Sequence, residues 1–189
     1  MSSYVDDELY AQLRAFMRDS IGLSQSDSGS HRSEVELLLF QEARLLDDRR
    51  YVDWLDLLTV ESVYWIPLNP LDDPATSWAL AFDDRRRIED RIAWIDTGKV
   101  HGQTPVSQTQ RSLTNIEVWT VNEKTCRTRC TFICHEYRPD RHRRWSGRLD
   151  YRLERSPEPS AGGATWQIAW KIVTLIDAEG PQENLTIIL

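Results

Sequence analysis

Three cysteines, Cys126, Cys130 and Cys134, are the first residues whose type and spacing suggest chemistry. Thiolates gathered at one point bind zinc or an iron–sulfur cluster. These cysteines lie in a segment of β-strand character, where residues four positions apart are separated by ~13 Å, too far to share one small metal centre. An odd number of cysteines also argues against a disulfide framework. We therefore expect three small side chains that face the core on the same side as Thr128 and Phe132.

The spacing of the histidines does not predict a metal site either. His31, His101, His135 and His142 contain no H-x-H or H-x-x-x-H pair, the local spacings expected of a zinc or non-haem iron site. A Rieske cluster requires paired cysteine and histidine ligands, and the sequence provides only the adjacent Cys134 and His135. We expect this chain to bind no metal and no other cofactor.

General acid–base catalysis needs only a carboxylate, imidazole or phenol with a shifted pKa inside a pocket. The candidates are Tyr64, Asp53 and His135, and each is expected to be structural. The sequence also lacks G-x-x-x-x-G-K-[ST], G-x-G-x-x-G and G-x-S-x-G, which would indicate nucleotide binding or a nucleophile elbow. No catalytic residue is predicted.

Charge and hydropathy exclude two further classes of function. The chain carries 23 Lys and Arg against 30 Asp and Glu, a net charge of −7, which is the wrong sign for neutralising the phosphates of nucleic acid. No apolar run approaches the ~20 residues of a transmembrane helix, and the N-terminus lacks the features of a secretory signal. We expect a cytoplasmic protein. A cluster of arginines is interpreted as a solvated edge, or alternatively as a contact for an acidic partner: Arg138, Arg141, Arg143, Arg144 and Arg148.

The elements that would position these residues begin with helices. Apolar residues at helical spacing, Leu9, Leu13, Phe16 and Met17, predict a first amphipathic helix after Asp6 and Asp7. A polar turn over 24–31 leads to a capping-box pattern, Ser33 to Glu36, which predicts the start of a second helix. Further segments are a third helix around 51–58, β-structure over 60–68 and 78–82, and a helix from Asp83-Asp84 to Gly98.

The second half of the chain predicts strands. Four β-like runs cover 111–121, 125–138, 143–155 and 165–177, with a turn-rich segment over 157–163. Such long strands imply a strongly twisted sheet. Alternation in the third run places Asp150 outward, together with the other charged residues. The residues that it places inward are Trp145, Leu149, Tyr151 and Leu153. In the fourth run the predicted inward set is Trp166, Ile168, Trp170, Ile172, Thr174 and Ile176.

The predicted fold class is therefore α+β, with N-terminal helices packed on a long, strongly curved antiparallel sheet. The length and the 40% hydrophobic content suit a single domain over 1–189. Residues 1–32 would form an N-terminal helix and a polar linker, and residues 33–189 a helix-filled cone.

Three segments resemble the small (beta) subunits of aromatic-ring-hydroxylating dioxygenases. The first is Leu37–Pro67 (LLLFQEARLLDDRRYVDWLDLLTVESVYWIP), the second Phe82–Asn115 (FDDRRRIEDRIAWIDTGKVHGQTPVSQTQRSLTN), and the third the apolar Asn184–Leu189 (NLTIIL). Their order and spacing carry the resemblance, which spans most of the chain after residue 35. One departure concerns Gln108 and Gln110, which stand where the family often has arginines.

The resemblance implies the cone-shaped, nuclear transport factor 2-like or cystatin-like fold. It also implies an iron-free subunit that forms the trimeric base of an α3β3 oxygenase, whose large (alpha) subunit holds a Rieske [2Fe-2S] cluster and a mononuclear iron. No catalytic residue carries over to this chain. The Gln108 and Gln110 departure would alter a surface that meets the large subunit.

Three hypotheses about function follow. The first is a structural subunit of a ring-hydroxylating dioxygenase that degrades an aromatic compound, with the apolar segment Leu185–Leu189 at subunit contacts. The second is a cofactor-free isomerase, dehydratase or cyclase that uses Tyr64, Asp53 or His135 inside the cone. The third is a module that binds a small apolar ligand without changing it.

Overall fold

The structure is a computed structural model that describes residues 2–19, 31–97, 105–139, 141–156, 165–180 and 185–189. The predicted turns over 24–30 and 157–163 and the helix stop at Gly98 lie outside this range. In chain order the elements are α1 (Asp7–Asp19), α2 (Arg32–Asp47), α3 (Tyr51–Leu55), β1 (Leu58–Pro67), β2 (Ala79–Asp84), α4 (Arg85–Asp96), β3 (Gln108–Asn122), β4 (Thr125–Arg138), β5 (Arg141–Arg155) and β6 (Trp166–Leu175).

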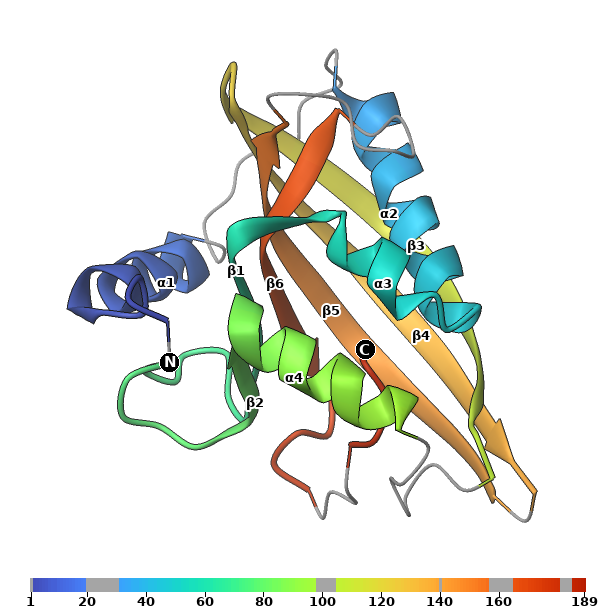
Figure 1. Cartoon of the computed structure of the whole chain (residues 1–189). Helices are drawn as coiled ribbons and strands as arrows, with labels where there is room; N and C mark the ends of the chain where they lie inside the picture. The colour runs from blue at the N-terminus through green and yellow to red at the C-terminus, as the bar shows by residue number, and fades with distance from the viewer. Residues whose placement is uncertain (1, 20–30, 98–104, 140, 157–164, 181–184) are drawn as a thin grey trace.

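The strands form one six-stranded sheet in the order β2-β1-β6-β5-β4-β3. Strands β3 to β6 follow one another as antiparallel neighbours, as predicted, and β3, β4 and β5 cross the whole molecule (Figure 1). One pair departs from the predicted antiparallel arrangement, because β1 runs parallel to β6. Strands this far apart in sequence are not joined by a hairpin, so no short turn forces them to be antiparallel.

The two faces of the sheet bury different helices. The face that carries the cysteines, called the inner face here, packs against α2, α3 and α4 around a large apolar core. The opposite, outer face packs against α1, whose Leu9, Leu13 and Met17 meet Val63 and Trp65 of β1. Figure 1 shows α1 standing apart from the other three helices. The first helix is therefore not part of the filling of the cone.

A local capping rule explains where α4 begins but not where α2 begins. α4 starts after Asp84, whose carboxylate accepts a hydrogen bond from the backbone of Arg87 at 2.9 Å, as expected of an N-cap. The predicted capping box at Ser33 is wrong, because α2 begins at Arg32 and its N-cap makes no side-chain cap bond. The Glu36 carboxylate instead pairs with the Arg32 guanidinium at 2.9 Å. The Arg32 side chain thus binds the Glu36 carboxylate, which the capping-box pattern predicts to accept a hydrogen bond from the backbone.

A bulge changes the faces of β6. The pairing of β5 with β6 shifts register between Arg152 and Leu153. Trp166 and Ile168 face inward as predicted, but after the shift Trp170 and Ile172 join the outer cluster, while Lys171 and Val173 turn inward. The predicted inward position of Ile176 is also wrong, because 79% of this side chain is exposed. One extra residue in a strand reverses every later side chain.

Candidate functional site

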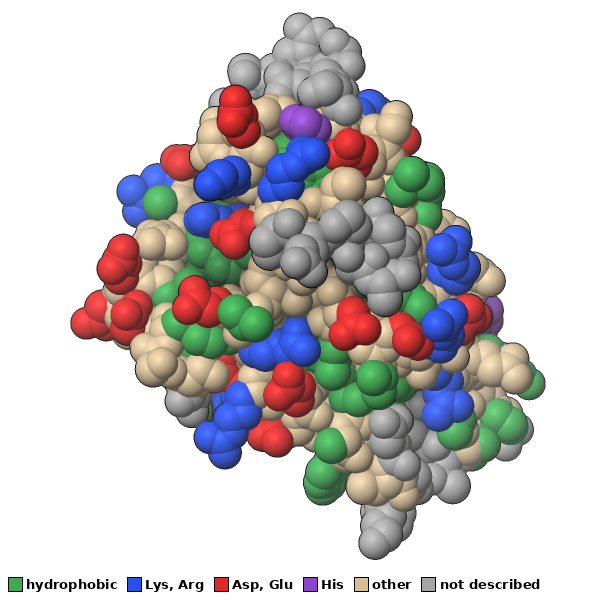
Figure 2. All heavy atoms as spheres, turned by 45° about the horizontal axis from the view of Figure 1, so that its top comes forward, with side chains coloured by type: hydrophobic (Ala, Val, Ile, Leu, Met, Phe, Trp, Pro, Cys, Tyr) green, Lys and Arg blue, Asp and Glu red, His purple; other side chains and the backbone are tan. Residues whose placement is uncertain are grey.

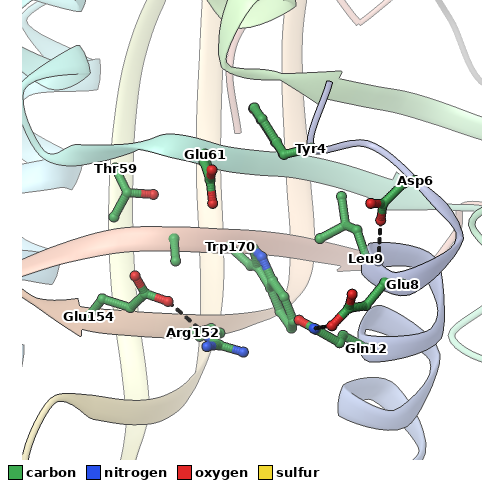
Figure 3. A pocket seen from close by; sticks show the side chains of 11 residues that line it. Tyr4, Asp6, Glu8, Leu9, Gln12, Thr59, Glu61, Arg152, Glu154 and Trp170 are labelled. Atoms are coloured by element: carbon green, nitrogen blue, oxygen red, sulfur yellow. Dashed lines mark hydrogen bonds and ion pairs between the residues drawn. The ribbon is translucent and has the colours of Figure 1, made fainter. Parts of the chain in front are cut away.

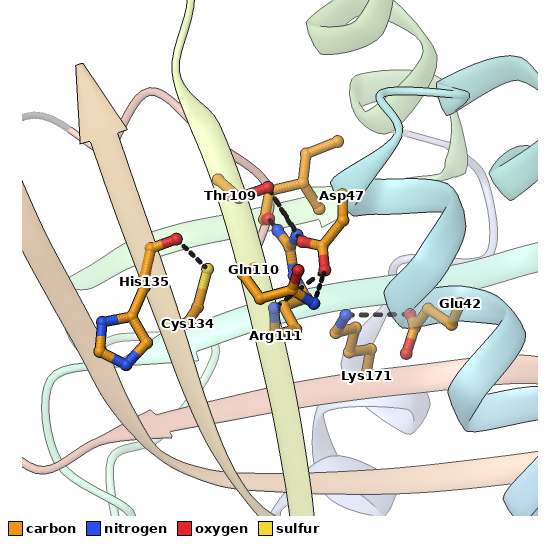
Figure 4. A network of polar contacts seen from close by, with 9 residues as sticks. Glu42, Asp47, Thr109, Gln110, Arg111, Cys134, His135 and Lys171 are labelled. Atoms are coloured by element: carbon orange, nitrogen blue, oxygen red, sulfur yellow. Dashed lines mark hydrogen bonds and ion pairs between the residues drawn. The ribbon is translucent and has the colours of Figure 1, made fainter. Parts of the chain in front are cut away.

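Four polar side chains meet on the inner face of the sheet. The Glu42 carboxylate of α2 accepts hydrogen bonds from Trp54 Nε1 of α3 at 3.1 Å, Tyr151 Oη of β5 at 2.7 Å and Lys171 Nζ of β6 at 2.9 Å. All four are buried, with at most 2% of each residue exposed. Figure 4 shows Lys171 pointing from β6 at Glu42 on the helix. This set, called the Glu42 cluster, is the candidate site that the interior offers.

The sequence contains a signal for Glu42. It occupies a position of the buried helical stripe that includes Leu38, Leu39, Leu45 and Leu46, all of which are buried. A carboxylate in such a stripe needs a partner inside the protein. Lys171 carried no comparable signal, because simple alternation in β6 places it outward and only the bulge turns it inward.

The electrostatics of the cluster favour a closed network. Burial lowers the pKa of Lys171, and the Glu42 charge opposes that shift. Burial, reinforced by the neighbouring Glu42, raises the pKa of Tyr151 well above its ordinary value. Three donors already occupy the two carboxylate oxygens, so Glu42 is engaged as an acceptor. A substrate could reach these groups only by displacing packed side chains.

A second, partly buried pair ties α2, β3 and the C-terminal segment together. The Arg111 guanidinium binds the Asp47 carboxylate and the Ile188 carbonyl, and Thr109 Oγ1 donates to Asp47 at 2.9 Å (Figure 4). Ile188 and Leu189 are each 1% exposed and belong to the inner core. The expectation that the apolar segment Leu185–Leu189 makes subunit contacts is therefore wrong for its last three residues, because this chain's own core buries them.

The structure does not bring the three acid–base candidates together. Tyr64 faces inward, where burial raises its pKa and its hydroxyl accepts a hydrogen bond from the Leu189 amide at 3.0 Å. Asp53 is exposed and pairs with Arg50 at 2.8 Å. His135 is exposed on the outer face of the sheet, with its ring 5.7 Å from that of His142. No shared pocket connects these three described residues.

The cysteines lie where the sequence predicts. None of these three described cysteines forms a disulfide, and all are fully buried in the inner core. Burial raises the pKa of Cys130 to about 12, which leaves its thiol protonated and unreactive at neutral pH. Among the residues that the structure describes, no group of three or more His, Cys, Asp or Glu side chains could hold a metal ion.

The arginine cluster is only partly a solvated edge. Asp150, predicted to point into solvent, is 0% exposed on the outer face, where Arg129 and Arg148 hold its carboxylate at 2.8 and 2.7 Å. Arg143 stacks on the Trp145 ring at 3.6 Å. These arginines therefore serve internal pairs. On the face shown in Figure 2, acidic, basic and apolar side chains are interspersed.

One pocket of about 250 Å³ lies between α1 and the outer face (Figure 3). Trp170 forms one wall, and local contacts engage part of the surrounding polar groups: Asp6 accepts from the Leu9 amide at 2.9 Å, and Arg152 pairs with Glu154 at 3.2 Å. The carboxylates that line it are Asp6, Glu8, Glu61 and Glu154. We interpret it as the seam at which α1 is anchored to the sheet.

Comparison with known proteins gives a consistent family. The profile of the family described as "Ring hydroxylating beta subunit" matches residues 41–179. The small oxygenase component of the p-cumate 2,3-dioxygenase system of Pseudomonas putida is 31% identical over 127 residues, which cover 66% of this chain and 71% of that protein. The 2-halobenzoate 1,2-dioxygenase small subunit of Burkholderia cepacia is 31% identical over 111 residues, or 56% of this chain and 67% of that protein.

Solved structures share the fold. The beta subunit of a benzoate 1,2-dioxygenase from Burkholderia mallei matches with a TM-score of 0.64 at 22% identity over 88% of this chain and 100% of that chain. A chain of naphthalene 1,2-dioxygenase with bound indole matches with a TM-score of 0.72 at 16% identity over 92% of this chain and 98% of that chain. A scytalone dehydratase-like protein from Novosphingobium aromaticivorans follows with a TM-score of 0.55 at 12% identity, over 76% and 82% of the two chains.

These matches confirm the curved-sheet, nuclear transport factor 2-like fold and the resemblance found in Leu37–Pro67 and Phe82–Asn115. Among the described helices, none combines the length and apolar character that a membrane span requires. The interior of the cone contains the Glu42 cluster and the segment that ends at Leu189. Because the family profile covers most of its length, the chain belongs to the beta-subunit family of the ring-hydroxylating dioxygenases.

Proposed function

We propose that this chain is the structural, iron-free beta subunit of a ring-hydroxylating dioxygenase and that it supports the assembly of catalytic alpha subunits. Membership in the beta-subunit family supports the proposal. The similar chains named above belong to oxygenases that act on aromatic compounds, so an aromatic compound is the proposed substrate class of the complex. We propose further that residues 1–189 fold as one unit.

The observation that carries this proposal is the filled interior of the cone. The Glu42 carboxylate already accepts hydrogen bonds from three donors inside this chain. Ile187, Ile188 and Leu189 pack beside them in the same core. A rigid, well-packed body of this kind suits a scaffold, because a scaffold must hold its partner-binding surfaces in fixed positions.

The partners and cofactors follow from the family. We infer that the large alpha subunit holds the Rieske [2Fe-2S] cluster and the mononuclear iron, and that the complex is α3β3 with a trimeric base of this chain. The described cysteines and histidines of this chain do not fit either iron centre: the cysteines are spread along β4, and no three candidate ligands converge.

Co-expression tests the proposal. The chain is produced alone and together with the large subunit of a ring-hydroxylating dioxygenase, and each product is measured by mass and by iron content. We expect a hetero-oligomer in which removal of this chain abolishes assembly while the isolated chain carries no iron. An isolated chain that remains monomeric and never enlarges the large-subunit complex would contradict the proposal.

A cofactor-free isomerase, dehydratase or cyclase is the second candidate function. The observation in its favour is that Glu42, Tyr151 and Lys171, which are groups able to transfer protons, meet inside a fold shared with a scytalone dehydratase-like protein. This function requires turnover by the isolated chain that is lost in Glu42→Gln. Absence of turnover in a folded, isolated chain would exclude it for the substrates tried.

A further inference from the structure

Part of the outer face of the sheet has no helix on it among the described elements. The apolar cluster that α1 forms on this face includes Val63 of β1 and Trp170 of β6, and none of its described members belongs to β3, β4 or β5. On these three strands the residues that point outward, away from the cysteines, are mostly exposed over 108–114, 131–137 and 142–148. We call this surface the open face.

The open face combines apolar and basic side chains. Ile133 and Tyr137 of β4 are 38% and 53% exposed, and Ile176, whose amide donates to the Ser146 carbonyl at 3.1 Å, is 79% exposed. Arg144 of β5 is exposed on the same face. None of the outward-pointing residues in the three ranges is acidic, although the chain as a whole has a net charge of −7. Exposed apolar side chains with a charged rim are typical of a surface that binds another protein.

An acidic surface lies at the other end of the outer face. It surrounds the pocket of about 250 Å³ beside α1, where Trp170 forms a wall (Figure 3). Among its described lining residues, Arg152 is the one cation, and the carboxylates are Asp6, Glu8, Glu61 and Glu154. This excess of carboxylates makes the surface negative, and its hollow shape suits an arginine side chain of another molecule.

The charges distinguish between two ways in which two copies of this chain could meet on the open face. Packing of one open face on another would place arginines against arginines, and like charges that face each other oppose association. Packing of an open face on the acidic surface of a second copy brings opposite charges together. The second arrangement is heterologous, because the two copies contribute different surfaces.

From this complementarity we propose that the open face of one copy binds the acidic surface of a second copy. Ile133 and Tyr137 lie at the centre of the contact, and Arg144 faces the carboxylates around Trp170. Each pair of copies keeps one free surface of each kind, so further copies add until a ring closes. The inference deepens the proposed function, and rests on it, in that it names the surfaces that would join copies in a trimeric base.

The test measures self-association of the full-length chain by analytical ultracentrifugation over a range of concentrations. Arg144→Glu reverses a charge on the open face, and Glu61→Arg reverses one on the acidic surface; both residues are exposed. Arg86→Glu, on α4 with its side chain 72% exposed, is the matched control for a reversal away from both surfaces. Circular dichroism and thermal unfolding establish that each variant is folded.

We expect self-association to weaken by about tenfold or more in Arg144→Glu and in Glu61→Arg, because each change opposes like charges across the contact. Arg86→Glu should associate as the wild type does. An equimolar mixture of Arg144→Glu and Glu61→Arg should associate again, because each variant supplies the surface that the other lacks. Added salt should weaken the association of the wild type, since salt screens charges at a surface.

The outcomes separate this inference from the proposed function. A wild-type chain that stays monomeric but enters a complex with the large subunit would overturn the inference and leave the assembly function standing; a chain that does neither would overturn both. Variants that associate as Arg86→Glu does, or a mixture that stays dissociated, would overturn the inference alone. Weaker binding to the large subunit with unchanged self-association would assign the open face to that subunit and would likewise overturn the inference.

Discussion

Replacement of Lys171 by methionine removes one charge from a pair whose two side chains are each only 3% exposed. The Glu42 carboxylate would then stay buried with two neutral donors and no counter-ion. Breaking a buried pair in this way costs about 3–5 kcal/mol. Because whole domains are stable by only ~5–15 kcal/mol, Lys171→Met should remove a large share of the free energy of unfolding.

Glu42→Gln and the double variant Glu42→Gln/Lys171→Met complete a double-mutant cycle with Lys171→Met. Together they separate the effect of charge from that of hydrogen bonding. Glu42→Gln leaves a neutral acceptor for Trp54 and Tyr151 and a buried amine, whose pKa burial already lowers. We therefore expect a loss near the lower end of the same range. The double variant has no buried charge and keeps the amide acceptor, so it should lie within about 1 kcal/mol of the wild type. The coupling energy between the two sites should be at least ~3 kcal/mol.

Urea unfolding followed by tryptophan fluorescence measures these free energies, since the chain contains 8 Trp and Trp54 touches the pair. The exposed pair of Arg50 and Asp53, at 2.8 Å with side chains 59% and 50% exposed, is the control and should couple by less than ~1 kcal/mol. A double variant that loses the sum of the two single losses would refute the reasoning, as would a Lys171→Met variant that loses less than ~1 kcal/mol.

Three further outcomes can be measured on the same chain. Deletion of 185–189 should lower the free energy of unfolding by more than ~4 kcal/mol even in the isolated chain, because each of its three buried apolar side chains contributes ~1.5–3 kcal/mol; unchanged thermal unfolding would contradict this. Gly147→Ala should cost at least the ~1–3 kcal/mol of ordinary overpacking, since its Cβ would lie 2.0 Å from the Thr174 carbonyl oxygen, and a full-stability variant would exclude that contact. The pKa of Cys130 is raised from 9.0 to about 12 in the folded chain. Between these pH values only the unfolded chain releases the thiol proton, so the free energy of unfolding is unaffected below pH 9 and falls between pH 9 and about 12. In Cys130→Ala the slope of the free energy of unfolding against pH should therefore be flatter over this range.

The antiparallel half of the fold was predictable because local rules govern it. Consecutive strands joined by short turns keep their alternation, and Trp145, Leu149, Tyr151 and Leu153 of β5 all face inward as their spacing predicts. β4 matches its predicted limits, 125–138. The cysteine orientation followed from the same rule.

The rest depended on distant contacts that no local pattern contains. The bulge in β6 reverses Trp170 and Ile172, and with them the orientation of Lys171. The parallel pairing of β1 with β6 joins segments about a hundred residues apart. The position of α1 on the outer face could not be inferred from its apolar stripe, because a stripe specifies that a helix is buried but not which surface buries it.

The candidate site divides in the same way. Glu42 could have been identified from its place in the apolar stripe of α2. Its partners could not, since they come from α3, β5 and β6. Asp150 was placed on the correct face, but its burial depends on the guanidinium groups of Arg129 and Arg148, which cover a carboxylate that alternation alone assigns to solvent.

The parallel neighbour of β1 also governs the order in which the chain can fold during synthesis. β1 lies between β2 and β6. The edge of β1 that pairs with β6 therefore stays open until residues 166–175 have left the ribosome. The contact of Glu42 with Lys171, 129 positions later in the sequence, likewise cannot form before that lysine has been synthesised. Contacts of such sequence separation form slowly, and partial chains expose apolar strand edges in the meantime. The nascent chain should therefore depend on chaperones until β6 is added, and a product truncated before β6 should aggregate instead of assembling.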